Sequence, residues 1–148
     1  MPERIKREGI SKPRLWTGRG IGGLAVAFLI FDGVTKLLLT NATVKGSEQL
    51  GYPSDATPVI GVILLICTAI YVIPKTGVFG AILLTGYLGG AIASHFRVGN
   101  GAFPIIFSGA YAVLIWVSLV LREPQLFSFI LMEPSPDKPQ LTPIGFEE

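Results

Sequence analysis

Two ionisable side chains interrupt the first long apolar run of this chain, residues 20–39, and they are its strongest candidates for chemistry. Asp32 and Lys36 are four residues apart, so a helix places both on one face. A run of this length can cross a bilayer, where a charge costs about 2.5–3.5 kcal/mol, so neither side chain is expected to face lipid. Two interpretations stay open. The pair is either a neutralised ion pair that fixes the rotation of its helix, or a proton or ligand contact inside a bundle.

Further polar side chains fall at a comparable height in the other apolar runs. At about 1.5 Å per residue, Asp32 lies roughly 18 Å from the start of its run, and Ser108 and Tyr111 lie roughly 8 and 12 Å below Phe103, the start of theirs. These heights predict an outward-opening polar pocket lined by Asp32, Lys36, Tyr87, His95, Arg97, Ser108 and Tyr111. In the alternative interpretation the tyrosines anchor the bundle at the membrane surface, and His95 and Arg97 are interfacial caps of their helix. For His95 and Arg97, considered without the other residues, this alternative is preferred.

Small residues recur at helical spacing in the third apolar run. Gly86, Gly90 and Ser94 are four residues apart, and Gly89 lies on the adjoining row. Stripes of this kind let helix backbones approach closely, where van der Waals contact drives association in lipid. We therefore expect Gly86, Gly89, Gly90 and Ser94 to pack against another helix, either of this chain or of a second copy.

The residues that many enzyme classes need are missing from the sequence. One cysteine, Cys67, and one histidine, His95, cannot build a zinc or iron–sulfur site, and no histidine pair is present for haem. The sequence contains no phosphate-binding loop, dinucleotide fingerprint, paired catalytic carboxylates or Ser-His-Asp arrangement. The net charge of +2 does not indicate nucleic acid as a partner. We therefore name no catalytic or metal-binding residue and do not expect a free-standing enzyme.

Four apolar runs must position these side chains. They cover residues 20–39, 57–73, 77–95 and 103–121, and none has the polar face that a soluble amphipathic helix would show. Half of the chain is hydrophobic and only 15% is charged, against about a quarter in soluble domains. The predicted fold is all-α, an integral membrane four-helix antiparallel bundle in the lipid bilayer, spanning residues 20–122.

The distribution of basic residues predicts the orientation. Four spans put both tails on one side, which then carries nine Lys and Arg residues against two on the other, and positive loops remain cytoplasmic. We therefore expect residues 1–19 to form a basic cytoplasmic tail and residues 123–148 a partly disordered cytoplasmic tail, in which residues 127–132 lie on the membrane surface. Residues 40–57 are expected to be an outward connection made of turns.

Several segments carry a resemblance to a known family. They are Asp32-Gly-Val-Thr-Lys36, Leu50-Gly-Tyr-Pro53, Ile60-Gly-Val-Ile63, Tyr71-Val-Ile-Pro-Lys-Thr76, the whole of residues 80–97, and Trp116 with Leu121-Arg122. Over about residues 16–131 the chain resembles the DoxX-like family of DoxX- and DoxD-related membrane proteins. The resemblance implies a small four-helix protein of the bacterial inner membrane. Members of the family often carry an acidic residue where this chain has Leu64, which leaves Asp32 without a partner carboxylate and favours its pairing with Lys36.

The resemblance also suggests a function. The family takes its name from a subunit of a quinol oxidase or thiosulfate–quinone oxidoreductase system. It therefore implies a non-catalytic subunit or accessory of a quinone-linked redox complex, with a quinone as the only cofactor it suggests and redox subunits or a second copy as partners. Two alternatives stay open: a bundle that binds or transports a small amphiphile, and a membrane-protein assembly factor.

Overall fold

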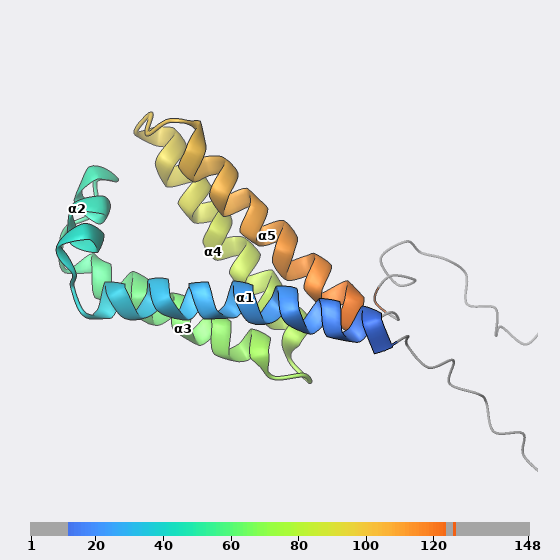
Figure 1. Cartoon of the computed structure of the whole chain (residues 1–148). Helices are drawn as coiled ribbons and strands as arrows, with labels where there is room; N and C mark the ends of the chain where they lie inside the picture. Colours follow the sequence, from blue (N-terminus) through green and yellow to red (C-terminus); the bar gives the residue numbers. More distant parts are fainter. Residues whose placement is uncertain (1–11, 124–125, 127–148) are drawn as a thin grey trace, which may run out of the picture.

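The computed structural model describes residues 12–123 and 126, and every regular element in this part of the chain is a helix. Four long helices form a closed ring of contacts, in which α1 and α4 each pack against both α3 and α5, and the short α2 contacts α1 and α3. The pairs α1–α3 and α4–α5 meet where α1 begins and diverge toward α2 (Figure 1). The helices are α1 (Lys12–Leu37), α2 (Asn41–Gln49), α3 (Ala56–Val72), α4 (Gly77–Arg97) and α5 (Ala102–Arg122).

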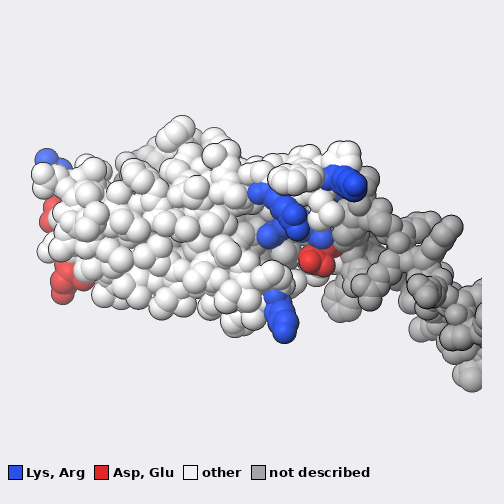
Figure 2. Space-filling view, turned by 60° about the horizontal axis from the view of Figure 1, so that its bottom comes forward, with Lys and Arg blue, Asp and Glu red and all other residues white. Residues whose placement is uncertain are grey.

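Three of these helices, α1, α4 and α5, are long and apolar enough to cross a membrane, whereas the apolar α3 is shorter, with 17 residues. Their outward faces carry large apolar side chains, among them Leu24, Phe79 and Ile106, which are 73%, 57% and 67% exposed. Figure 2 shows a broad uncharged surface between two charged ends of the molecule. Such a surface fits contact with lipid hydrocarbon and would be unusual for a soluble monomer.

The core of the bundle lies in the half where the two helix pairs meet. Leu64, Leu84 and Ile115 from three different helices are fully buried there. Tyr71 is 1% exposed, and its hydroxyl donates to the carbonyl oxygen of Ile115 at 3.1 Å. A buried hydroxyl without such a partner would be costly, so this bond also fixes α3 against α5.

Glycines let the helices approach one another, at Gly80 and Gly22 in this half and at Gly61 nearer to α2. A Cβ on Gly80 would overlap the backbone of Tyr71, so α4 touches α3 backbone to backbone. A Cβ on Gly61 would lie 2.9 Å from the carbonyl oxygen of Gly33, which makes the α1–α3 contact equally close. On Gly22 an added Cβ would overlap the hydroxyl of Ser118 on α5.

The predicted glycine stripe does not make such contacts within this chain. A Cβ added to Gly86, Gly89 or Gly90 would meet no heavy atom within 4 Å in the described part of the chain. Of the two partners left open, another helix of the same chain is therefore wrong for these three glycines within the described residues, and a second copy stays a prediction. The reason is that the two helix pairs have already diverged at their height, and α4 packs closely against α3 at Gly80, about two to three turns earlier.

Two further differences from the sequence analysis concern element boundaries. Helix α2 lies in the connection where only turns were expected, and it begins at a Thr40 cap whose hydroxyl accepts from the backbone N–H of Thr43. Helix α1 begins at Lys12, so residues 12–19 extend the helix beyond the apolar run. The expectations for the remaining tails, including a surface segment at 127–132, fall outside the described residues.

Candidate functional site

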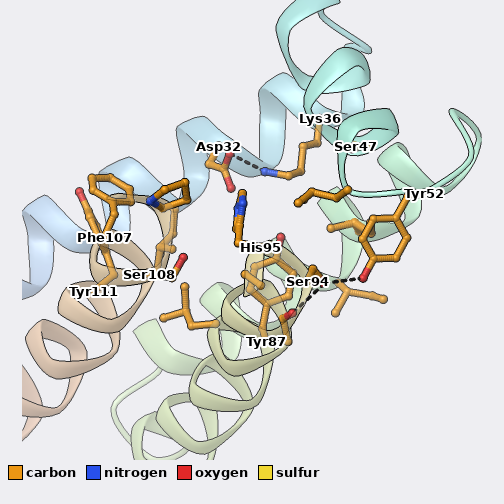
Figure 3. Close-up of a pocket in the computed structure, with 18 of the residues that line it drawn as sticks. Asp32, Lys36, Ser47, Tyr52, Tyr87, Ser94, His95, Phe107, Ser108 and Tyr111 are labelled. Atoms are coloured by element: carbon orange, nitrogen blue, oxygen red, sulfur yellow. Dashed lines mark hydrogen bonds and ion pairs between the residues drawn. The ribbon is translucent and has the colours of Figure 1, made fainter. Parts of the chain in front are cut away.

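A cavity of about 500 Å³ lies where the two helix pairs diverge. Helices α1, α3, α4 and α5 form its walls, while Ser47 of α2, Leu50 and Tyr52 line the end beyond them. Figure 3 shows side chains from all these directions converging on one space. The cavity exists because Gly86 and Gly90 leave room on α4 where larger side chains would fill it.

The structure brings together six of the seven side chains expected to share a pocket. Asp32 and Lys36 come from α1, Tyr87 and His95 from α4, and Ser108 and Tyr111 from α5; all line this cavity. Arg97 does not line it. Its side chain is exposed, and one of its guanidinium nitrogens (Nη2) donates to the carbonyl oxygen of Leu50 at 2.7 Å. The predicted height of Arg97 is near the pocket, but its position on the helix turns it to the outside.

Asp32 and Lys36 form an ion pair one helical turn apart on α1, joining Lys36 Nζ to Asp32 Oδ1. Their side chains are 32% and 18% exposed, and both line the cavity. The pair therefore has open space in front of it and is not sealed inside the core. This arrangement lets it neutralise itself while still offering a carboxylate oxygen and an ammonium group to a ligand.

His95 lies on α4 across from this pair. Figure 3 shows its ring rising from the helix toward Asp32 and Lys36. Its Nδ1 lies 3.1 Å from the side-chain amide of Asn100, which orients the imidazole. The opposite ring nitrogen, Nε2, makes no hydrogen bond within the described residues. Because Asn100 holds the ring by one nitrogen, the other can donate to or accept from a ligand.

Aromatic rings form the wall of the cavity on the α5 side. The ring of Phe28 lies 4.6 Å from that of Tyr111 and 5.3 Å from that of Phe107, measured between centroids. Phe107 in turn lies 5.8 Å from Phe103, so four rings follow one another along the wall. Such a surface is suited to hydrocarbon or to a flat ring system. These phenylalanines were not among the residues predicted to line the pocket, although the spacing of Phe103, Phe107 and Tyr111 puts them on one helix face.

Two hydrogen bonds hold the α2–α3 connection against the end of α4, at the edge of the cavity. The hydroxyl of Tyr52 lies 2.8 Å from that of Ser94, and Arg97 reaches the carbonyl of Leu50. Ser94 is buried and also donates to the carbonyl of Gly90. Ser94 was expected to pack against a helix, but it bonds to this connection instead. Hydropathy could not predict that Tyr52 and Ser47 line the cavity, because it does not show where the segment between α1 and α3 lies relative to the helices.

The combination can bind a molecule that is polar at one end and apolar at the other. The ion pair, the imidazole and the hydroxyls of Ser108 and Tyr111 supply donors and acceptors, and the four rings supply an apolar surface. Leu64, at the position where the family often has an acid, is fully buried in the core and does not reach the cavity lining. The pocket thus has one carboxylate, Asp32, among its described lining residues.

A family model described as the DoxX-like family matches residues 21–118, about two thirds of the chain. The matched region covers the cavity and all of α2, α3 and α4. Comparison with curated proteins and with solved structures gives no significant match. The chain therefore belongs to the DoxX-like family, and this membership together with its long apolar helices indicates a multi-pass membrane protein.

Proposed function

We propose that this protein binds a small amphiphilic molecule within the membrane, in the cavity between its two helix pairs. The observation that carries the proposal is the juxtaposition, in one space of about 500 Å³, of an ion pair and an imidazole with a wall of aromatic rings. Pockets for small molecules combine an apolar lining with a few well-placed polar groups. The ion pair and the imidazole lie on α1 and α4, so a headgroup would sit near Asp32 and His95 and its apolar part along Phe28 and Tyr111.

The orientation in the membrane completes this proposal. Helix α3, with 17 residues, reaches about 25 Å and makes a fourth span of an antiparallel bundle if the bilayer adjusts slightly. Lys12, Arg14, Arg19, Lys75 and Arg122 lie at the end where α1 begins, and Lys45 and Arg97 lie at the other. The excess of basic residues at the first end favours termini in the cytoplasm, and membership of the DoxX-like family supports a location in the bacterial inner membrane. The cavity would then lie in the periplasmic half.

The test uses a pair of glycines that differ in one respect. Gly90 lines the cavity, whereas the neighbouring Gly89 does not, and an added Cβ meets no atom within 4 Å at either position. Gly90→Leu should therefore fold and fill the cavity, and Gly89→Leu should fold and leave it open. The probes are a short-chain quinone and a ten-carbon fatty acid, added to detergent-solubilised full-length protein while its thermal unfolding is followed.

We expect at least one probe to raise the unfolding temperature of the unmodified protein and of Gly89→Leu, and to lose most of this effect on Gly90→Leu. A ligand present at a hundred times its Kd contributes about 2.7 kcal/mol to stability, which is readily measured. Equal responses of the two variants, or no response of the unmodified protein to either probe, would contradict binding in this cavity.

A second candidate function is a non-catalytic subunit of a redox complex that holds a quinone. It is favoured by the same aromatic wall, because a quinone ring can lie against Phe28 and Tyr111 while its oxygens meet donors such as His95. Purification from native membranes in mild detergent, followed by solvent extraction, should then yield a quinone with the unmodified protein and with Gly89→Leu. Its absence from both preparations, together with the absence of co-purified redox proteins, would count against this role.

A further inference from the structure

We propose a second binding site at the basic end of the bundle, which takes the phosphate group of an anionic ligand. The site is a cavity of about 180 Å³ whose lining includes Arg19, Tyr71, Gly77 and Arg122. It shares no lining residue with the large cavity and lies at the opposite end of the helices. The inference therefore does not depend on the function proposed above.

Arg122 is held in place before any ligand arrives. Its side chain packs against α1, where a Cβ on Gly18 would lie 3.2 Å from the Cγ of Arg122. Its guanidinium carbon lies 5.3 Å from the centroid of the Tyr71 ring, which is itself buried and fixed by its bond to Ile115. A cation over an aromatic face is attracted to it, so the head of Arg122 is oriented at the rim of the cavity.

Two guanidinium nitrogens at this end are buried without an acceptor. The Nε atoms of Arg14 and Arg122 have no hydrogen-bond partner within residues 12–123 and 126. A buried donor without a partner is unfavourable by about 1–3 kcal/mol, and more when it is charged. Of these two residues, Arg122 lines the cavity and Arg14 does not. Phosphate oxygens are the acceptors that match the fork of a guanidinium best, so a phosphate bound in the cavity would offer acceptors to Arg122.

The charges around the cavity also favour an anion. Arg19 and Arg122 line it, with Lys75 next to its lining residue Pro74, and Glu123 is the acidic group on the described lining. Glu123 is exposed, and no ion pair joins it to either arginine in the described part of the chain. The local charge is therefore positive even with Glu123 ionised.

The beginning of α4 adds backbone donors to the same space. Gly77, its first residue, lines the cavity, and Thr76 does not cap the helix with its side chain. The hydroxyl of Thr76 turns away to the carbonyl of Ile70 at 2.8 Å. The first N–H groups of a helix have no partner inside it and carry a partial positive charge, which together suit a phosphate group.

The ligand class is a phosphate monoester or diester with a net negative charge, which zwitterionic phosphatidylcholine lacks, and two sources share this chemistry. The site lies at the end of a membrane-embedded bundle, where the headgroups of anionic phospholipids are at the same height. A soluble phosphate would reach the same arginines from the aqueous side. The test therefore uses both: phosphatidylglycerol against phosphatidylcholine in mixed micelles, and inorganic phosphate in micelles of phosphatidylcholine.

Arg19→Gln is the decisive variant because Arg19 is exposed, lines the cavity and is not part of the packing that holds Arg122. Lys12→Gln is its matched control, since it removes the same charge from the same helix but from a residue outside the lining. With full-length protein, native mass spectrometry should show bound phosphatidylglycerol, and Arg19→Gln should weaken this binding about tenfold, because it removes a charge-assisted hydrogen bond to the phosphate. Lys12→Gln should leave it within a factor of two.

Each result of these measurements either supports the phosphate site or overturns it. If the protein retains phosphatidylglycerol but is not stabilised by inorganic phosphate, the ligand is a lipid headgroup. If inorganic phosphate also stabilises the protein, and Arg19→Gln loses this stabilisation, the site binds the phosphate group itself. Equal losses in Arg19→Gln and Lys12→Gln would show a diffuse effect of charge and overturn the proposal. So would the absence of binding by both probes.

Discussion

At the scale of single residues, the Asp32–Lys36 pair decides between two interpretations of the cavity. Replacing only Asp32 with Asn leaves the Lys36 charge without its partner at lipid depth, so Asp32→Asn should lower the free energy of unfolding by about 2–3 kcal/mol. Lys36→Met in the same chain removes that charge, and the double variant should recover a coupling energy of about 1–2 kcal/mol. Unfolding by a denaturing detergent measures these values for all four proteins.

The double variant also separates a structural pair from a ligand contact. If the pair only fixes the rotation of α1, the double variant should bind the amphiphile probes as the unmodified protein does. If the pair contacts the headgroup, the double variant should fold and lose most of the thermal stabilisation by the probe. Because both residues line the cavity and are partly exposed to it, we expect the second result. Strictly additive effects on stability would show that the two charges do not act as a pair.

At the scale of elements, the contact between α3 and α4 depends on one glycine. Gly80→Ala would drive a methyl group into the backbone of Tyr71, so α4 must move away from α3. We expect an unfolding temperature lowered by several degrees, in line with overpacking costs of about 1–3 kcal/mol. Gly86→Ala on the same helix has open space at its Cβ and should leave stability unchanged or slightly raised, because alanine favours helix. Equal losses in both variants would contradict this assignment.

The same two glycines show what hydropathy and spacing can and cannot predict. The apolar runs predicted the four long helices, since length and apolar character are properties of each segment alone. Spacing alone pointed to Gly86, Gly89 and Gly90 as the packing face, but where helices touch depends on how whole pairs diverge. Spacing along α4 could not identify Gly80 as a contact residue, because its partner is the backbone of Tyr71, a residue on another helix.

The cavity shows the same limit. Counting heights along straight helices put Asp32 and Tyr111 in the outer half of the bilayer and His95 at its outer surface, and the structure places all three around one space. Heights say nothing about rotation, so Arg97 was expected in the lining although it turns outward. They also say nothing about connections, so α2 and Tyr52 were missed: polar turns were expected there, and a Thr40 cap starts a helix instead.

At the scale of the whole molecule, the proposed orientation makes Lys45 and Lys75 face opposite sides of the membrane. Lys45 lies on α2, and Lys75 lies in the turn between α3 and α4; both are exposed. Cysteine at either position should therefore react with a membrane-impermeant maleimide from one side only. The native Cys67 is buried and provides the unreactive background in the unmodified protein.

With both termini in the cytoplasm, intact cells stripped of their outer barrier should label Lys45→Cys, and Lys75→Cys should react only after the membrane is opened. The physical reason is the retention of positive loops on the cytoplasmic side, which the basic end of the bundle follows (Figure 2). The reverse labelling pattern would mean that the protein has the opposite orientation, with the large cavity in the cytoplasmic half and the site of Arg19 and Arg122 outside. Labelling of both positions from one side would mean that the chain crosses an even number of times between them, which contradicts a spanning α3.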